Sequence, residues 1–206
     1  MRNVTIIMKF LFTAICFFIA ANLFAQTGAA YINTIKTYQK KYVATHEVVK
    51  GKTRKLFRFF TADENFKIQC RFESATDTAV ISMKTSGKTI PQKDFKRYGK
   101  LLFTIHDTAL QLTVYQSVQQ NPLYKNYLFI PFTDVTTGDE TYGSGRYIDI
   151  ETTDIKNNTV TIDFNKAYNP YCAYSTGYNC PIPPRENYLV VAIKAGEKNF
   201  AKSLAH

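Results

Sequence analysis

The feature that most constrains the fold is a strict alternation of apolar and polar residues between Phe66 and Phe72. Successive side chains of a β-strand point to opposite faces, so this alternation predicts a strand with one buried face and one face in water. The buried set is Phe66, Ile68, Cys70 and Phe72, and the exposed set is Lys67, Gln69 and Arg71. Cys70 is therefore predicted to be a core thiol rather than a reactive one.

The same rhythm, interrupted by turn residues, recurs along most of the chain. The other predicted strands are Leu56–Phe60, Ala79–Lys84, Lys100–His106, Leu110–Ser117, Tyr127–Phe132, Arg146–Glu151, Val160–Phe164 and Tyr188–Lys194. The first of these is expected to form a hairpin with the alternating strand through residues 62–65. Tight turns are expected at residues 106–109 and 156–158, since Asn tolerates the positive φ that such turns need.

One segment near the N-terminus has helical rather than strand spacing. Its aromatic and aliphatic residues recur at steps of four, three and four, with lysines off that stripe: Tyr31, Ile35, Tyr38 and Tyr42 against Lys36, Lys40 and Lys41. This spacing predicts an amphipathic helix from about Gly28 to Thr45. Because no βαβ alternation follows, we expect a mainly β fold, an antiparallel barrel or sandwich-like sheet with one N-terminal helix.

Residues 1–25 have the order of a cleavable secretory signal. Arg2 and Lys9 precede an apolar run at Phe10–Ala21, and Ala25 provides a small residue at the cut. The run is shorter than the about 20 apolar residues that span a bilayer, which disfavours a retained anchor. We therefore expect an exported protein, periplasmic or secreted, in which residues 26–206 form a single mostly β domain that does not span the membrane.

The chain is basic, with a formal net charge of +10 that falls to +8 when the predicted signal is removed. A basic surface favours anionic partners such as lipid headgroups or acidic glycans. The lysines are mostly scattered singly among Thr, Ser and Asn, however, which is typical of a solvated surface. Nucleic acid is not an expected partner outside the cytoplasm.

Polar and conformationally special residues concentrate in the last third of the chain. They form a series of short motifs: Asp134, Gly145-Arg146-Tyr147, Asp163-Phe164-Asn165, Ala167-Tyr168-Asn169-Pro170, Cys172-Ala173-Tyr174, Cys180-Pro181, Pro183-Pro184, Asn187 and Ala195-Gly196-Glu197-Lys198. In this order they resemble the uncharacterised bacterial and archaeal domain-of-unknown-function family numbered 1684. The similarity covers roughly residues 55–200 and is strongest over residues 127–198. The resemblance implies that this third is the shared working part, but the family has no established activity and supplies no catalytic residue.

Two interpretations of Arg146 remain open. The bare backbone of Gly143 and Gly145 beside a guanidinium suits a carboxylate or phosphate ligand. Alternatively, the glycines make a turn or bulge, and Arg146 pairs with Asp134 or Asp163 to hold the loop. The second interpretation is favoured, because structural ion pairs are common at such corners.

Carboxylates are also numerous in this region, and two of them could act as the paired acids of a glycosidase. The candidates are Asp134, Asp139, Glu140, Asp149 and Asp163. Asp134 with Thr136, and Asp163 with Asn165, are also typical of turns capped by side chains. We favour this structural interpretation.

Cys172 and Cys180 enclose seven residues, and in an oxidising compartment a disulfide between them is expected. A zinc site would need two more ligands, and His46 and His106 lie far away in the sequence, so no metal site is expected. A nucleophilic Cys172 would need a base, yet no His lies between His106 and His206. The same gap argues against a Ser-His-Asp hydrolase.

These features lead to one main hypothesis and two alternatives. The main hypothesis is an exported β-domain without a cofactor that binds a small anionic or sugar-like ligand in a polar cleft, since tyrosines suit stacking on sugars. The alternatives are a carboxylate- or cysteine-dependent hydrolase of the cell envelope, and a structural or assembly protein. The sequence leaves open whether the domain is an enzyme. The candidate ligand-binding residues are Asp134, Thr136, Arg146, Asp163, Asn165 and Tyr168.

Overall fold

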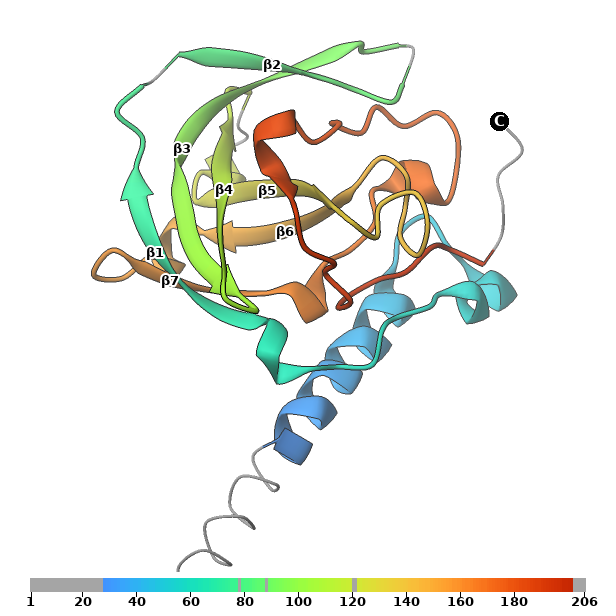
Figure 1. Ribbon diagram of the computed structural model, residues 1–206. Coiled ribbons are helices and arrows are strands. Elements are labelled where there is room, and N and C mark those ends of the chain that lie inside the picture. Colours follow the sequence, from blue (N-terminus) through green and yellow to red (C-terminus); the bar gives the residue numbers. More distant parts are fainter. Residues whose placement is uncertain (1–27, 78, 88, 120–121, 202–206) are drawn as a thin grey trace, which may run out of the picture.

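The computed structural model describes residues 28–77, 79–87, 89–119 and 122–201. The predicted signal at residues 1–25 lies outside the described residues. Within them the protein is mainly β, with one main helix at residues 28–45, as the sequence predicts. Figure 1 shows a strongly curved sheet, with this helix beside it.

The sheet has eight strands and forms a half-barrel. The strands are β1 Lys67–Ser74, β2 Val80–Lys84, β3 Gln92–Ile105, β4 Thr108–Ser117, β5 Tyr127–Asp134, β6 Arg146–Glu151, β7 Thr159–Asp163 and β8 Tyr188–Leu189. Their order is β6-β5-β4-β3-β1-β7, while β2 pairs with β3 and β8 pairs with β5. All pairs are antiparallel except β5 with β8. The ends of this path, β6 and β7, do not pair with each other, and we call the gap between them the seam.

Short 3-10 helices lie before the first strand and between later strands. They are η1 Gly51–Leu56, η2 Glu64–Phe66, η3 Pro122–Tyr124, η4 Thr152–Asp154, η5 Phe164–Lys166, η6 Tyr171–Ala173 and η7 Arg185–Asn187. The two predicted tight turns are confirmed by positive φ angles at His106, Asp107, Asn157 and Asn158. These are left-handed conformations that a two-residue hairpin turn requires.

The long strand β3 pairs with β4 along one edge, where the register shifts at a bulge between Arg97 and Gly99, and with two other strands along its opposite edge. Its first half pairs with β2, and its second half pairs with β1. A Cβ at Gly99 would lie 2.4 Å from the ring of Phe72, so only glycine lets β3 pass this closely over that side chain.

Two hydrophobic clusters occupy opposite faces of the sheet. The larger cluster fills the inside of the half-barrel and includes Phe72, Leu112 and Ile130. The smaller cluster lies on the outer face, where β2 covers it, and consists of Met83, Phe95, Tyr115, Phe129 and Tyr147. The predicted alternation of β1 is confirmed, since Cys70 and Phe72 are buried while Lys67, Gln69 and Arg71 are exposed.

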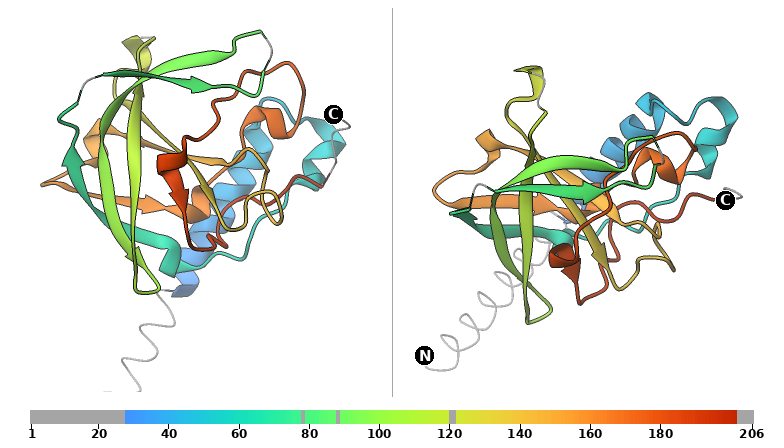
Figure 2. Two further views of the ribbon diagram at one scale, coloured as in Figure 1. Left: turned by 45° about the horizontal axis from the view of Figure 1, so that its top comes forward. Right: turned by 90° about the horizontal axis from the view of Figure 1, so that it is seen from above.

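Figure 2 shows the helix beside the sheet, and the predicted stripe of the helix contacts the end of β7, the residues after it and the C-terminal segment. The Tyr31 hydroxyl donates to Asp163, the Tyr38 hydroxyl donates to the carbonyl of Lys166, and the Tyr42 hydroxyl donates to Glu197. The helix thereby forms one wall beside the seam.

Two strand predictions are wrong. Residues 51–56 form η1, and Phe59 makes only an isolated bridge to Glu197, so Leu56–Phe60 is no hairpin partner of β1. Both edges of β1 are instead taken by the distant strands β3 and β7. Of the predicted Tyr188–Lys194 strand, only Tyr188–Leu189 pairs, because the segment beyond it turns away to meet Arg146.

Candidate functional site

The first predicted group, Arg146 with Asp134 and Thr136, is buried. The exposed fractions of these residues are 1%, 2% and 3%. Arg146 Nη2 lies 3.5 Å from Asp134 Oδ1, and the Thr136 hydroxyl donates to both oxygens of that carboxylate. Asp134 and Arg146 therefore close on each other and do not face a cleft.

The other contacts of this pair also lie within the protein. The Arg146 guanidinium donates to the carbonyls of Ile193, Ala195 and Glu197, and the Ile193 N–H donates to Asp134 at 2.7 Å. Burial lowers the pKa of Arg146 to about 10, and the neighbouring Asp134 charge opposes that shift. The arginine thus stabilises the segment after β8, and the structure favours the second interpretation of Arg146 over an anion cradle.

Gly145 in the same motif is explained by packing. It has a φ of +85°, and a Cβ at this position would lie 2.6 Å from the carbonyl oxygen of Phe132. No bulkier residue fits this approach without a shift of the backbone. The glycine therefore permits the turn into β6 and is not evidence for a ligand.

A second buried group surrounds Glu197, whose exposed fraction is 0%. Its carboxyl group accepts hydrogen bonds from the hydroxyls of Tyr42 and Tyr174 and from the N–H of Asn169. Burial raises the pKa of Glu197 to about 7, and these hydrogen bonds limit the rise. This residue joins the helix, the segment after β7 and the C-terminal segment.

The second predicted group, Asp163 with Asn165 and Tyr168, lies beside the seam. Asp163 Oδ1 accepts hydrogen bonds from the Tyr31 hydroxyl and from the backbone and side chain of Asn165. Asn165 is buried, and its side chain also exchanges hydrogen bonds with the backbone of Asp63. Asn165 is therefore a structural link, while Asp163 and Tyr168 line a cavity.

This cavity, which we call the seam pocket, has a volume of about 440 Å³. It lies between β6 and β7, with a wall from the helix and from the residues after β7. Its lining residues are Tyr38, Ile148, Asp149, Ile150, Asp154, Thr161, Ile162, Asp163, Lys166 and Tyr168. Isoleucines from the barrel interior thus adjoin carboxylates and tyrosine rings, which is the mixture found in small-molecule sites.

Asp149 is the carboxylate around which the seam pocket is built. The Tyr127 hydroxyl donates to Oδ1 and the Tyr168 hydroxyl donates to Oδ2, each at 2.7 Å. Desolvation raises the pKa of Asp149, and the two tyrosine hydrogen bonds oppose the rise. No lysine or arginine among the described residues forms an ion pair with Asp149.

The charge of the seam pocket is predominantly negative. Asp149, Asp154 and Asp163 contribute three carboxylates, and Lys166 contributes one ammonium group. The Lys166 Nζ lies 5.6 Å from the centre of the Tyr38 ring. An anion would therefore meet net repulsion in this pocket, whereas a donor of hydrogen bonds would meet acceptors.

A second cavity of about 330 Å³, which we call the aromatic pocket, adjoins the seam pocket. Its lining residues are Lys93, Tyr127, Phe129, Tyr147, Tyr168, Pro170, Tyr171, Tyr178, Asn179, Cys180 and Pro181. Tyr168 lines both cavities. The aromatic pocket lies on the outer face of the sheet, and the loop between Cys172 and Cys180 forms part of its wall.

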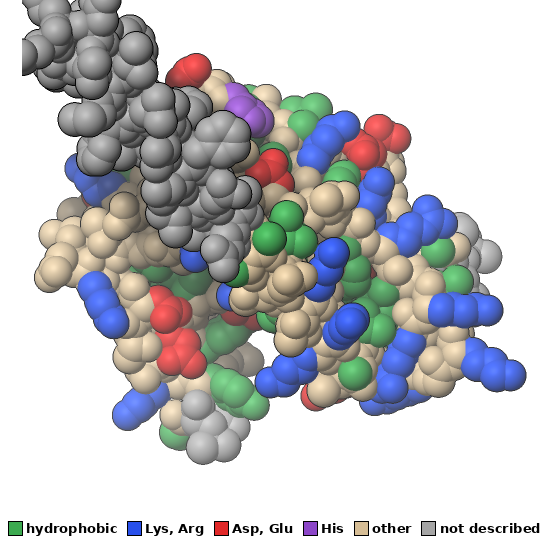
Figure 3. Space-filling view, turned by 90° about the horizontal axis from the view of Figure 1, so that it is seen from below, with side chains coloured by type: hydrophobic (Ala, Val, Ile, Leu, Met, Phe, Trp, Pro, Cys, Tyr) green, Lys and Arg blue, Asp and Glu red, His purple; other side chains and the backbone are tan. Residues whose placement is uncertain are grey.

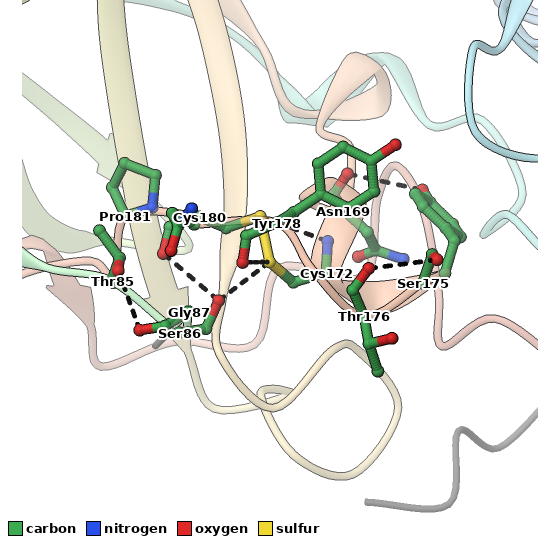
Figure 4. The surroundings of a disulfide bond; sticks show 12 residues. Thr85, Ser86, Gly87, Asn169, Cys172, Ser175, Thr176, Tyr178, Cys180 and Pro181 are labelled. Atoms are coloured by element: carbon green, nitrogen blue, oxygen red, sulfur yellow. Dashed lines mark hydrogen bonds between the residues drawn. A yellow bond between two sulfur atoms is a disulfide. The ribbon is translucent and has the colours of Figure 1, made fainter. Parts of the chain in front are cut away.

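Cys172 and Cys180 form the expected disulfide, with Cα atoms 6.3 Å apart (Figure 4). The Ser86 N–H donates to the Cys180 carbonyl, and Thr85 forms a bridge with Pro181, so the loop is attached to the end of β2. Cys70 is free and buried, and burial raises its pKa to about 12. Both findings leave no reactive thiol among the described residues.

The described residues contain no group of three or more His, Cys, Asp or Glu side chains that could hold a metal ion. None of the helices in the described part of the chain is long and apolar enough to cross a membrane. On the face shown in Figure 3, Lys and Arg side chains are spread among other residues.

Comparison with known proteins places the sequence in a family. The family described as "Protein of unknown function (DUF1684)" matches residues 53–198. The chain belongs to the DUF1684 family. It is also similar to an uncharacterised protein of Haloarcula marismortui solved by solution NMR, with 25% identity and a TM-score of 0.61. That similarity covers 81% of this chain and 92% of the archaeal one, and no curated protein matches.

The motifs by which the sequence resembles DUF1684 proteins contribute mainly to the interior of this structure. Asp134, Arg146, Asn165, Asn187 and Glu197 are all buried and hydrogen-bonded. Asn187, for example, donates to the carbonyls of Thr113 and Pro131 and so attaches η7 to the sheet. In this member of the DUF1684 family, the seam pocket contains only Asp163 and Tyr168 from the motifs, whereas the aromatic pocket also contains Tyr147, Pro170, Cys180 and Pro181.

Several cavity residues are missing from the six candidate ligand-binding residues: Tyr38, Tyr127, Asp149, Asp154 and Lys166. Of these, only Asp149 is named from the sequence in another functional role, as one of the possible paired acids of a glycosidase. Asp149 carries a local signal, because the alternation of β6 places it on the face opposite Ile148 and Ile150. Tyr38 is predicted only as a member of the buried helical stripe. Nothing in the sequence indicates that it meets β6 and β7 across the seam.

Proposed function

We propose that this domain is an exported, non-enzymatic binding module whose seam pocket takes a neutral, sugar-like ligand. The observation that carries the proposal is a cavity of about 440 Å³ whose lining combines three carboxylates and two tyrosines with isoleucines. The sequence leads us to expect an anionic or a sugar-like ligand. The negative charge of the carboxylates disfavours an anion, whereas a neutral sugar can donate hydrogen bonds to them.

The acceptors in the pocket support a ligand with several hydroxyl groups. Each oxygen of Asp149 receives one tyrosine hydrogen bond, and a carboxylate has about four acceptor positions in total. The hydrogen bonds of the Asp163 side chain all go to Oδ1, and Oδ2 has no hydrogen-bond partner among the described residues. Hydroxyl groups of a sugar would donate to these oxygens, and hydrogen bonds to charged groups contribute more than neutral ones.

The apolar part of the pocket supports the same class. Sugar rings present C–H groups on their faces, and these pack against aromatic and aliphatic side chains. Tyr38 and Tyr168 offer flat apolar surfaces with polar tips, and the two strands beside the pocket add Ile148, Ile150 and Ile162 to the lining. A pocket that combines both kinds of surface suits an amphipathic ring better than a simple ion.

Export is part of the proposal and rests on two features. Residues 1–25 have the pattern of a secretory signal. The Cys172–Cys180 disulfide supports an oxidising compartment, since structural disulfides are rare in the cytosol.

One observation favours a second candidate function, a carboxylate-dependent hydrolase. Asp149 has a raised pKa and shares the pocket with Asp163, and glycosidases use a pair of carboxyl groups of which one, the general acid, has a raised pKa. The cysteine-dependent form of this alternative does not fit, because the Cys172 sulfur is bonded to Cys180.

A calorimetric titration of the purified domain tests the proposal. The probes are glucose, galactose and N-acetylglucosamine as neutral sugars, and phosphate and citrate as anions. We expect at least one neutral sugar to bind, and Asp149→Asn to weaken that binding by about tenfold to a hundredfold. Asp107→Asn, an acid-to-amide change in an exposed turn, is the matched control and should bind like the wild type.

The outcomes separate the candidates. Binding of the anions alone would refute the sugar-binding proposal. Cleavage of an aryl glycoside that disappears in Asp149→Asn would replace it with the hydrolase. Sugar binding without cleavage supports the binding module.

A further inference from the structure

We infer that the seam pocket and the aromatic pocket are two adjoining subsites for one oligosaccharide chain, so that the domain takes two or more linked sugar rings. This inference rests on the proposed function. It goes beyond it by assigning the aromatic pocket to the site and by naming a chain, not a single sugar, as the ligand.

The two cavities meet at Tyr168, which lines both. Its hydroxyl donates to Asp149 Oδ2, and the Tyr127 hydroxyl from the aromatic pocket donates to Oδ1 of the same carboxylate. The backbone of Tyr168 pairs with that of Tyr147 on the edge of β6, which fixes its position between the cavities. A ligand that extends from one cavity would pass this residue and enter the other.

The lining of the aromatic pocket is chemically suited to a second ring. The Phe129 and Tyr147 rings are nearly perpendicular, with centres 4.7 Å apart, and the Tyr171 and Tyr178 rings meet at 67°, with centres 5.2 Å apart. The cavity is therefore bounded by aromatic faces and edges in more than one orientation. Pyranose rings stack on such surfaces, and their equatorial hydroxyls remain free for the solvent or for Asn179.

Most of these rings are held in place without a ligand. The Tyr147 hydroxyl donates to the Pro181 carbonyl, and the Tyr171 hydroxyl donates to Glu47 at 3.0 Å. Tyr178 is 38% exposed, and its hydroxyl forms no hydrogen bond within the described part of the chain. A site whose walls are already ordered loses little side-chain entropy on binding, which favours affinity.

The charge in the aromatic pocket disfavours a cationic ligand. Lys93 is the one charged residue in the lining of the aromatic pocket, and it is positive. A quaternary amine prefers an aromatic cage that has no ammonium group at its rim. A neutral chain has no such conflict and can use carboxylates in one subsite and aromatic faces in the next.

The test compares chain lengths on the intact domain. Glucose, cellobiose and cellotetraose form one probe series, and N-acetylglucosamine with its dimer and tetramer forms a second. In the wild type we expect the tetramer of one series to bind at least tenfold more tightly than its monomer. Choline is the cationic probe and should not bind.

Variants of Tyr178 assign the gain to the aromatic pocket. Tyr178→Ala should reduce the affinity for the tetramer by about threefold to tenfold and leave the monomer unaffected, since one aromatic contact contributes about 0.5–1.5 kcal/mol. Tyr178→Phe keeps the ring and should bind the tetramer like the wild type. Tyr188→Ala removes an exposed tyrosine outside both cavities and serves as the control.

The two levels of the proposal fail differently. If a monomer binds, and neither chain length nor Tyr178→Ala changes affinity, the two-subsite inference is wrong while the single-sugar function stands. Equal losses for monomer and tetramer in Tyr178→Ala would also overturn the inference. If no sugar of either series binds, or if choline alone binds, the proposed function is wrong as well.

Discussion

The Tyr168 hydroxyl donates a 2.7 Å hydrogen bond to Asp149, so a residue that lines both cavities contacts the carboxylate of the seam pocket. Asp149 is unusual in having two tyrosine donors and no cation in an ion pair within the described residues. Its protonation should therefore depend directly on these two hydroxyls.

Removal of one donor should raise the pKa of Asp149 further. Tyr168→Phe deletes the hydrogen bond to Oδ2, which favours the charged form, whereas desolvation of the carboxyl group remains. A carboxyl-detected NMR titration should show the Asp149 transition at higher pH than in the wild type. Tyr188→Phe removes the hydroxyl of an exposed tyrosine and should leave the pKa of Asp149 unchanged. An unchanged or lower pKa in Tyr168→Phe would contradict this account of the site.

Glu197 should make the domain less stable as pH rises toward neutrality. Its pKa in the folded protein is raised from 4.5 to about 7, so the folded state holds the proton more tightly than the unfolded state. The contribution to the free energy of unfolding is full below pH 4.5 and is lost as pH rises through about 7. The loss amounts to about 3 kcal/mol.

Glu197→Gln isolates this effect, because glutamine does not titrate and can still bond to Tyr42 and Tyr174. Urea unfolding between pH 4.5 and 8 should show the wild type losing stability relative to the variant by about that amount. Parallel curves for the two proteins over this range would show that Glu197 has no raised pKa.

Arg146 should be far more important for stability than a surface arginine. Arg146→Met leaves Asp134 buried without its ion-pair partner, which costs about 3–5 kcal/mol. The exposed Arg71–Glu73 pair supplies the control, and Arg71→Met should cost no more than about 1 kcal/mol. The measurement is the urea midpoint of each variant. Equal, small effects would mean that Arg146 is not a structural residue and would reopen its interpretation as a ligand contact.

Loss of the disulfide should destabilise the domain moderately. The bond closes a loop with a sequence separation of 8, and the loop-closure entropy corresponds to about 2–3 kcal/mol. The double variant Cys172→Ser with Cys180→Ser should unfold at correspondingly lower urea. Addition of a reductant should lower the wild-type midpoint to the same value and leave the double variant unchanged. A wild-type midpoint that does not respond to the reductant would show that the cysteines are not bonded.

The strand predictions succeed where one face of the strand is buried against the core. In β1 one face is buried and the other faces solvent, so apolar and polar residues alternate between Phe66 and Phe72. The same reasoning predicts both ends of β6 correctly. Leu56–Phe60 fails because an apolar segment can be buried without pairing, as Phe57 is within the aromatic cluster around His46. The sequence pattern indicates which residues are buried, but it does not indicate which strand a segment pairs with.

The candidate site divides in the same way. Of the candidate residues, Asp163 and Tyr168 line the seam pocket, whereas Asp134, Thr136 and Arg146 are buried. All of them belong to the last third of the chain, which contributes both to the interior and to the cavities. Proximity in the sequence gathers residues into one region and does not decide which of them face a cavity. Asp149 and Tyr38 belong together only because the half-barrel leaves β6 and β7 unpaired beside the helix.

The sequence by itself determined the local periodicity: a helix at residues 28–45, β-strands after it, two turns with left-handed residues and a closed cysteine loop. These are properties of neighbouring residues, whose side-chain directions follow from the backbone alone. The tertiary structure decided which strand edges pair, where the sheet stays open and which polar groups lose water. These outcomes depend on contacts between residues more than a hundred positions apart, such as Tyr31 with Asp163, and no local pattern specifies them.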